Sequence, residues 1–276
     1  MTLKKIARHV MAAVRIKNIV PIYQWKCDST LLSGKVALIV GGTGKIGQSV
    51  ALSLLECGCK VIITGSKDST VQNALSSLKN SSNLKGITLE LTKFDSYKKK
   101  VEEAKKIFGK IDIFIHSAGV HTENVNFCSL TEAEYDRVMD IDLKSTFFFS
   151  QVIAKYMLEN KISGHILLIS SSRGFEPAWS PYGLAKWGTN GLVKGLAKLL
   201  TPQGIIVNGI APGSTATPLV GYSEGETVYT SENYMGRYVM PEEVGNIAKF
   251  LVSDMGNMVI GDVISISGGR GTFDIR

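Results

Sequence analysis

Residues 35–58 read "KVALIVGGTGKIGQSVALSLLECG", which is an apolar run, a glycine-rich turn and a helical stretch. Within the turn, Gly41, Gly44 and Gly47 give the spacing G-x-x-G-x-x-G, and Gly42 adds a fourth glycine. Glycine permits a tight turn and a close approach of the backbone to a pyrophosphate, which then lies at the positive N-terminus of the helix. The stretch therefore predicts a strand, turn and helix that bind a dinucleotide.

The same turn excludes another phosphate-binding motif. Its "GTGK" segment, residues 42–45, is similar to the end of a P-loop. A P-loop also needs glycine five positions before Gly44, where Ile39 stands, and serine or threonine after Lys45, where Ile46 stands. A dinucleotide is therefore the better ligand.

Apolar runs alternate with helical stretches along the chain from residue 35 onward. Near-continuous aliphatic runs indicate strands that are covered on both faces, as in a parallel sheet flanked by helices. The runs are KVALIV (35–40), KVIIT (60–64), ITLEL (87–91), IDIFIH (111–116), HILLIS (165–170), IIVNGI (205–210) and DVISIS (262–267). They predict an α/β protein with one doubly wound, Rossmann-type sheet of seven parallel strands and helices on both faces.

Two of the intervening helices have clear boundaries in the sequence. One is expected from Ser96 to Phe108. The other is expected to run without interruption from Thr131 to about Glu159, and Thr131 with Glu134 forms a capping box at its start. No internal repeat or linker indicates a second domain.

The composition narrows the classes of protein that are possible. The chain has 276 residues with 44% hydrophobic content, enough for one large core, and no apolar run approaches the ~20 residues that span a bilayer. The net charge of +7 is concentrated in residues 1–27, which hold six Lys and Arg and no acid. The remainder has 25 basic against 24 acidic residues, which argues against a groove that binds nucleic acid.

Residues 1–33 are an extension ahead of the main domain, which spans residues 34–276. Apolar side chains recur here at helical spacing with cations between them, which predicts a basic amphipathic helix. The apolar positions are Leu3, Ile6, Ala7, Val10, Met11 and Val14. Such a helix can pack against the body or a sister subunit, contact an anionic membrane surface, or serve as a targeting peptide.

The cysteines and histidines lack the paired spacing of a zinc site, so no metal is expected. They are Cys27, Cys57, Cys59, Cys128, His9, His116, His121 and His165. Buried or reduced thiols are the better interpretation, and they fit a reducing, cytoplasmic compartment.

The end of the second apolar run bears on which dinucleotide is bound. An acid at this position accepts the 2′-hydroxyl of NAD and repels the 2′-phosphate of NADP. Here Ser66 and Lys67 follow the run, no carboxylate precedes Asp68, and Lys45 is available from the glycine turn. The two cations favour NADP(H) over NAD(H), and the alternative is that both are accepted.

A tyrosine and a lysine stand four residues apart in "SPYGLAKWG", residues 180–188. On a helix, Tyr182 and Lys186 share one face, so the ammonium lies near the phenol. A free phenol has a pKa near 10 and transfers protons poorly at neutral pH, whereas a neighbouring cation favours its ionised form. The pair alone is either a packing accident or an acid/base, and the rest of the chain must decide between them.

In their order and spacing these segments resemble the short-chain dehydrogenase/reductase family, over about Lys35 to Gly269. The Y-x-x-x-K of that family is "YGLAK" here, and its strand-end serine corresponds to Ser171. Three further segments are similar to family motifs, namely "IHSAG" at 115–119, "IAPGSTAT" at 210–217 and "IGDVISISGG" at 260–269.

The resemblance implies an oxidoreductase that transfers a hydride between NADP(H) and a carbonyl or secondary alcohol, as 3-oxoacyl reductases do, and that forms a homodimer or homotetramer. It implies that Tyr182 is the acid in reduction and the base in oxidation, that Ser171 binds the substrate oxygen, and that Lys186 holds the nicotinamide ribose. The residues expected to contact the cofactor are Gly41, Thr43, Gly44, Lys45, Ile46, Gly47, Ser66, Lys67, Leu91, Ser117, Ala118, Gly119, Tyr182, Lys186, Pro212, Gly213, Thr215 and Thr217.

The chain departs from the family at Asp142, where members commonly have an asparagine that helps to hold a proton-relaying water. A carboxylate can accept a proton from that water or from Lys186, but its charge disfavours a phenolate. We expect Asp142 to keep a catalytic role in the relay, with a shifted pH optimum. His116 and Ser117 replace the usual asparagines, and His116 is interpreted as a structural residue.

Residues 217–241 resemble a substrate lid, and nothing in them selects one substrate. Side chains that can line a pocket or pack the lid are Tyr222, Tyr229, Tyr234, Met235 and Arg237. Two other functions stay open at this point. The glycine spacing allows a nucleotide-sugar reductase or epimerase, and Asp142 with the basic extension allows a non-catalytic, dinucleotide-binding scaffold.

Overall fold

The structure is a computed structural model that describes residues 28–79, 81–122, 126–223 and 225–272. The predicted basic helix at the N-terminus falls within residues 1–27, outside the described residues. None of the described helices is long and apolar enough to cross a membrane.

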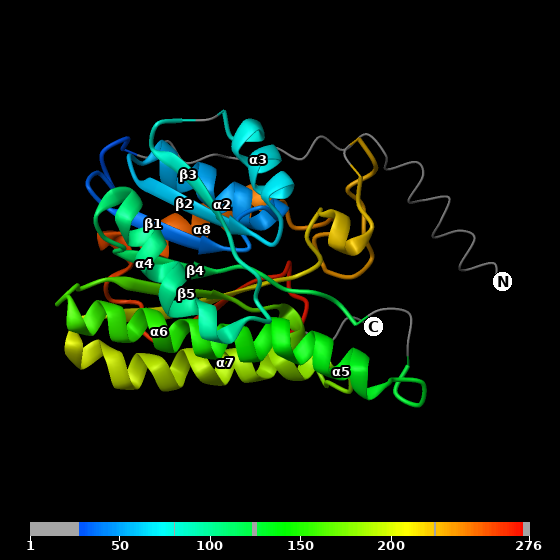
Figure 1. Cartoon of the computed structure of the whole chain (residues 1–276). Coiled ribbons are helices and arrows are strands. Elements are labelled where there is room, and N and C mark those ends of the chain that lie inside the picture. The colour runs from blue at the N-terminus through cyan, green and yellow to red at the C-terminus, as the bar shows by residue number, and fades with distance from the viewer. Residues whose placement is uncertain (1–27, 80, 123–125, 224, 273–276) are drawn as a thin grey trace.

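Seven parallel strands form one sheet in the order β3-β2-β1-β4-β5-β6-β7 (Figure 1). The strands are β1 Val36–Val40, β2 Lys60–Gly65, β3 Leu84–Thr88, β4 Ile113–His116, β5 His165–Ile169, β6 Ile206–Pro212 and β7 Val263–Ile266. The order reverses between β1 and β4, the place where ligands bind in doubly wound sheets. The predicted fold class is confirmed.

The third strand begins three residues earlier than the sequence predicts. It spans Leu84–Thr88, and Leu84 pairs in register with Val61 of β2. The apolar run at residues 87–91 therefore extends past the end of β3. Its last three residues, Leu89, Glu90 and Leu91, border a groove that is described below. Its apolar side chains are therefore shared between a strand and a binding surface.

Helices cover both faces of the sheet (Figure 1). One apolar cluster packs α2 Lys45–Glu56, α3 Asp68–Ser77 and α8 Pro241–Leu251 against the sheet, and the other packs α4 Tyr97–Phe108, α6 Ser145–Glu159 and α7 Pro181–Leu200. Short 3₁₀ turns lie at Phe94–Ser96, Ser172–Gly174, Thr201–Gln203, Pro218–Val220 and Asp254–Gly256. The sheet is thus buried on both sides, as its near-continuous apolar strands require.

The uninterrupted helix predicted from Thr131 to Glu159 is wrong in one respect. Helix α5 spans Glu132–Met139, a π-helical segment follows at Asp140–Lys144, and α6 begins after it. The predicted cap at its start is present, because the Thr131 hydroxyl accepts a hydrogen bond from the Glu134 N–H at 3.2 Å. A π-helical turn fits an extra residue into the helix and commonly lies at a functional site.

The expectation of reduced thiols is wrong at Cys57, which is disulfide-bonded. Cys59 and Cys128 are free, and Cys27 lies outside the described residues. The cysteines therefore give no argument for a reducing compartment, and the cytoplasmic assignment that rested on it has no support from them.

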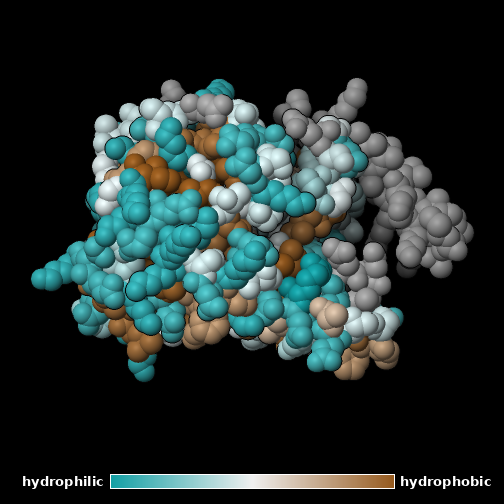
Figure 2. Space-filling model, viewed as in Figure 1, coloured by the Kyte–Doolittle hydropathy of each residue, from teal (hydrophilic) through white to brown (hydrophobic). Residues whose placement is uncertain are grey.

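Hydrophilic side chains cover much of the face viewed in Figure 2, with apolar patches between them. On the long helices, exposed apolar side chains include Phe147 and Phe148 of α6 and Leu184 and Trp187 of α7. They are compatible with a subunit contact, and the homodimer or homotetramer stays a prediction.

The glycine turn is closed by direct contact between backbones. A Cβ atom on Gly47 would lie 2.3 Å from the carbonyl oxygen of Gly41 and 2.8 Å from Cα of Gly42. We expect Gly47→Ala to lower the free energy of unfolding by about 1–3 kcal/mol and to weaken dinucleotide binding, because the turn must open.

Gly191→Ala in α7 is the matched control, since nothing lies within 4 Å of its added Cβ. This exchange should raise the free energy of unfolding by about 0.5–1 kcal/mol. Urea unfolding of both variants makes the comparison, and equal stabilities for the two would contradict the described packing of the turn.

Candidate active site

A groove opens at the carboxyl ends of β1, β2 and β4, where the strand order reverses. Gly41 has φ of +75°, and a Cβ atom there would lie 2.5 Å from the backbone nitrogen of Ala118, so two loops meet across the groove. The groove has a volume of about 400 Å³. Its lining residues are Gly41, Thr43, Gly44, Thr64, Gly65, Ser66, Leu89, Glu90, Leu91, Thr92, Ser117, Ala118, Gly119, Val120 and Ile141.

Eight of the predicted cofactor residues lie in this groove, namely Gly41, Thr43, Gly44, Ser66, Leu91, Ser117, Ala118 and Gly119. The Ser117 hydroxyl is buried without a hydrogen-bond partner among the described residues. A buried polar group without a partner is costly, so this hydroxyl fits a polar ligand in the groove. The groove therefore suits a dinucleotide in size and in chemistry.

Four other predicted cofactor residues, Lys45, Ile46, Gly47 and Lys67, are not among the lining residues. Lys45 begins α2 and Lys67 immediately precedes α3, and both side chains are exposed. The sequence did not single out Glu90, whose carboxylate lies at the groove and 2.7 Å from Lys93. The groove thus presents a carboxylate as well as two exposed cations beside it.

A buried ion pair joins Lys186 of α7 to Asp142 of the π-helical segment. Lys186 Nζ lies 3.6 Å from Asp142 Oδ2, and both side chains are at most 5% exposed. Lys186 also donates to the Ile169 carbonyl at 3.3 Å, and Asp142 Oδ1 accepts from the Val120 N–H at 2.7 Å. Burial raises the pKa of the Asp142 carboxyl, and the charge of Lys186 and the Val120 N–H oppose this shift.

Tyr182 lies one helical turn before Lys186, whose Nζ is 5.4 Å from the centroid of the phenol ring. Helix α7 begins at Pro181, and the Ser180 hydroxyl caps it by accepting from the Gly183 N–H at 3.2 Å. This start fixes the place of Tyr182 in the first turn.

Ser171 follows β5, and its hydroxyl accepts from the Arg173 N–H at 3.2 Å. Ser171 and Tyr182 line one cavity of about 290 Å³. The other lining residues are His121, Ser172, Arg173, Gly213, Ser214, Val220, Glu232, Tyr238 and Arg270. The structure thus brings together the serine, the tyrosine and the lysine that the sequence singled out.

Of the four cofactor residues predicted within residues 212–217, which end β6 and follow it, one lines the cavity. Gly213 lines the cavity, whereas Thr215 and Thr217 are buried and Pro212 ends the strand. The Thr215 hydroxyl donates to the Gly213 carbonyl at 2.9 Å. These threonines therefore shape the loop that carries Gly213.

His116 is buried beneath the site, and its ring nitrogens lie 3.1 Å from the Ser145 hydroxyl and 3.3 Å from the Thr146 hydroxyl. Burial, followed by the charge of Lys186, lowers the pKa of His116 to about 3. The ring is therefore neutral at physiological pH, which agrees with a structural role.

The sequence missed His121, whose ring centroid lies 4.3 Å from that of Tyr182. Burial lowers the pKa of His121, and the charges of Lys186 and Arg173 add to this shift. His121 stands two residues after the "SAG" segment, but no spacing in the sequence connects it with Tyr182, because the contact is between distant loops.

The predicted lid lines the cavity through Val220, Glu232 and Tyr238. The five side chains singled out in the sequence are not among the described lining residues, which leaves the alternative that they pack the segment. Arg237 makes a two-pronged contact with Glu243, at 2.7 and 2.8 Å, so its charge is already paired. This contact ties the end of the segment to α8.

Known proteins resemble the chain over most of its length. The family model described as enoyl-(acyl carrier protein) reductase matches residues 42–270. A 3-oxoacyl-[acyl-carrier-protein] reductase of Aquifex aeolicus is 32% identical, with 86% of this chain and 98% of the relative covered. A 3α-hydroxysteroid dehydrogenase of Mediterraneibacter gnavus is 31% identical, with 86% and 97% covered.

Two solved structures also resemble it, each at 25% identity and with a TM-score of 0.79. One is a 3-ketoacyl-(acyl-carrier-protein) reductase of Brucella melitensis complexed with NADH, with 87% of this chain and 99% of that chain covered. The other is a variant of actinorhodin polyketide ketoreductase with NADPH, with 87% and 98% covered. On the extent of these matches, the chain belongs to the short-chain dehydrogenase/reductase family of enzymes.

Proposed function

We propose that this enzyme is an NADP(H)-dependent reductase of 3-oxoacyl substrates, with Tyr182 as its proton donor. The observation that carries the proposal is the shared cavity of Ser171 and Tyr182, with the buried ammonium of Lys186 next to the phenol. A dinucleotide in the groove beside Gly119 would supply the hydride. A Cβ atom on Gly119 would lie 3.4 Å from both Lys186 Nζ and Asp142 Oδ2, so the groove adjoins the ion pair.

The side chains of the cavity have distinct tasks in this proposal. Ser171 donates a hydrogen bond to the carbonyl oxygen and holds it as negative charge develops there. Tyr182 gives its proton to that oxygen in reduction and takes it back in oxidation. Lys186 stabilises the phenolate left after proton transfer and holds the nicotinamide ribose. Asp142 keeps the ammonium in place and passes protons to and from it.

The proposed substrate class rests on the relatives. The relative from Aquifex aeolicus is named as a 3-oxoacyl reductase, and the protein in one of the solved structures is named as a 3-ketoacyl reductase. A relative at 31% identity is named for a hydroxysteroid, so steroid ketones are the second candidate class. No feature of the cavity favours a nucleotide sugar or a non-catalytic scaffold, and we carry neither further.

Replacement of the tyrosine tests its chemical role. Tyr182→Phe should lower kcat for reduction of acetoacetyl thioesters about 10²- to 10⁴-fold, because the proton donor is lost while the ring remains. Dinucleotide binding, followed by fluorescence, should persist. Tyr238→Phe is the control, since it removes another phenol from the same cavity. Comparable losses in both variants would contradict the assigned role of Tyr182.

Asp142→Asn tests the influence of the buried carboxylate. Its negative charge favours the ammonium and disfavours a phenolate nearby, so its removal should move the pH–rate profile of alcohol oxidation to lower pH by about 0.5–1 unit. Because the pKa of Asp142 is raised, its carboxylate takes up a proton at a higher pH than an exposed aspartate does. The step that this protonation adds to the pH–rate profile of the parent enzyme should be absent in the variant. The measurement is kcat/KM between about pH 5 and 10.

Asp140→Asn is the matched control, because Asp140 lies in the same segment, is partly exposed and pairs with Lys144 at 3.0 Å. Its profile should match that of the parent enzyme. An unchanged profile in Asp142→Asn, or the same shift in both variants, would exclude a relay role for Asp142.

The preference for NADP(H) is tested by direct titration with NADPH and NADH. The exposed Lys67 should add about 1 kcal/mol to NADPH binding, so Lys67→Gln should weaken NADPH about fivefold and NADH less than twofold. Lys98→Gln, an exposed cation on α4, controls for overall charge. Equal weakening of both cofactors by Lys67→Gln would contradict the preference, and Glu90 would then be the group to examine.

A further inference from the structure

Two cavities meet at Tyr182. Besides the cavity that contains Ser171, a second one of about 200 Å³ also has Tyr182 in its lining. It is lined by His121, Thr122, Arg173, Pro177, Ala178, Trp179, Ser180, Tyr182 and Gly183. His121 and Arg173 line both cavities, as Tyr182 does. A molecule that reaches Tyr182 through either cavity therefore also meets Arg173.

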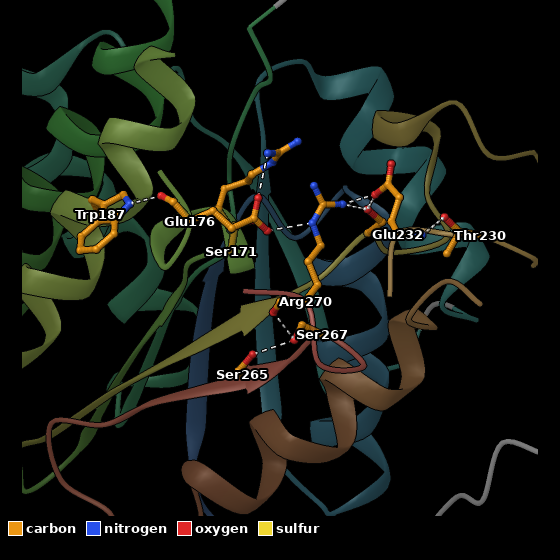
Figure 3. A network of polar contacts seen from close by, with 10 residues as sticks. Ser171, Glu176, Trp187, Thr230, Glu232, Ser265, Ser267 and Arg270 are labelled. Carbon is orange, nitrogen blue, oxygen red and sulfur yellow. Dashed lines mark hydrogen bonds and ion pairs between the residues drawn. The ribbon is translucent and has the colours of Figure 1, made fainter. Parts of the chain in front are cut away.

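A second guanidinium, that of Arg270, lines the cavity with Ser171 and is linked to Arg173 by a carboxylate. Glu176 accepts from Arg270 Nε at 2.8 Å through one oxygen and from Arg173 Nη1 at 2.8 Å through the other (Figure 3). The backbone carbonyl of Glu176 accepts from Trp187 Nε1 at 2.7 Å, which anchors it to α7. We call Arg173, Glu176 and Arg270 the arginine wall.

The charges of the arginine wall do not cancel. Its two guanidinium groups line the cavities, whereas Glu176 is not among the described lining residues of either one. One carboxylate against two guanidinium groups leaves one positive charge at the surface of the cavity. Arginine presents its donors in a rigid fork that matches carboxylate and phosphate groups.

Glu232 balances this charge from the predicted lid. Its carboxylate contacts Arg270 Nη1 and the Ser214 hydroxyl, and its side chain is 49% exposed (Figure 3). Among the described residues that line the two cavities, Glu232 is the single carboxylate. Because the Glu232 carboxylate is half exposed, water remains available to solvate it when an incoming anion takes its place at Arg270.

We propose that the substrate carries an anionic group, a carboxylate or a phosphate, that binds to the arginine wall in place of the Glu232 carboxylate. This inference rests on the proposed function, since it specifies which carbonyl compounds reach Tyr182. The side chain of Arg173 is 52% exposed, so Arg173 is the more accessible cation. The side chain of Arg270 is 14% exposed and is held in place by its contacts. The neutral part of the substrate then lies along Trp179 and Ala178 of the second cavity.

Matched pairs of substrates test the inference. The first pair is a short-chain oxo acid and its methyl ester, and kcat/KM is measured for three such pairs, with the oxo group at position 4, 5 or 6. The other is acetoacetyl-coenzyme A and the neutral acetoacetyl thioester of N-acetylcysteamine. The first pair reports on a carboxylate and the second on the phosphates of a carrier arm. In the parent enzyme, kcat/KM should favour the anionic member of at least one pair about tenfold or more.

Variants assign the preference to the arginine wall. Arg173→Gln should reduce the ratio of anionic to neutral kcat/KM about 10- to 100-fold, mainly through KM, because the contact is made equally in the ground state. Glu232→Gln should raise that ratio, because it removes the competing carboxylate. Lys99→Gln, an exposed cation on α4, should leave the ratio unchanged. Arg270→Gln is less suitable alone, because Arg270 ties three loops together.

Equal kcat/KM for both members of both pairs, or an anionic preference that survives Arg173→Gln, would overturn the inference while leaving the proposed function intact. If no ketone is reduced, the proposed function fails, and titration of the enzyme and NADP⁺ with hexanoate and methyl hexanoate judges the inference separately. Tighter binding of hexanoate that is lost in Arg173→Gln supports it, and equal binding of acid and ester overturns it.

Discussion

The active-site architecture depends on one buried ion pair, between Lys186 and Asp142. Removing both charges from water costs several kcal/mol per ion, so such a pair depends on further hydrogen bonds to its two groups. The Ile169 carbonyl accepts one from Lys186 and the Val120 N–H donates one to Asp142 Oδ1, whereas Asp142 Oδ2 has no hydrogen-bond partner among the described residues. The pair thereby fixes the first turns of α7 relative to the sheet, and Tyr182 is held one turn away.

The ion pair also joins the two halves of the site. On one side lies the groove at the reversal of strand order, and on the other the cavity that contains Ser171. Gly119 stands between them, close to both charges of the pair. The groove that suits a dinucleotide therefore adjoins the cavity that contains Tyr182, which is the arrangement that the proposed transfer of a hydride and a proton to one carbonyl needs. Substrate specificity then depends on the residues that line the cavity, including those of the predicted lid, residues 217–241.

Short-range patterns predicted the fold, and they singled out a serine, a tyrosine and a lysine that the structure brings together. The glycine spacing, the alternating runs and the i,i+4 pair of Tyr182 and Lys186 are local features, and local geometry determines what they do. The π-helical segment was missed because a single extra residue leaves no mark on an apolar pattern. His121 and Arg270 were missed because tertiary folding alone brings them to Tyr182. The cations Lys45 and Lys67 are exposed and lie next in sequence to lining residues rather than in the lining itself, which the sequence pattern does not distinguish.

In the proposed mechanism, one carbonyl oxygen lies between Ser171 and Tyr182 while the cofactor lies against Lys186. A crystal structure of the enzyme with an oxidised dinucleotide and a ketone or alcohol measures this directly. We expect the ligand oxygen within about 2.6–3.2 Å of both hydroxyl oxygens and the dinucleotide along the groove from Gly41 to Gly119. A dinucleotide bound elsewhere, or a ligand oxygen beyond hydrogen-bond distance of Tyr182, would contradict it.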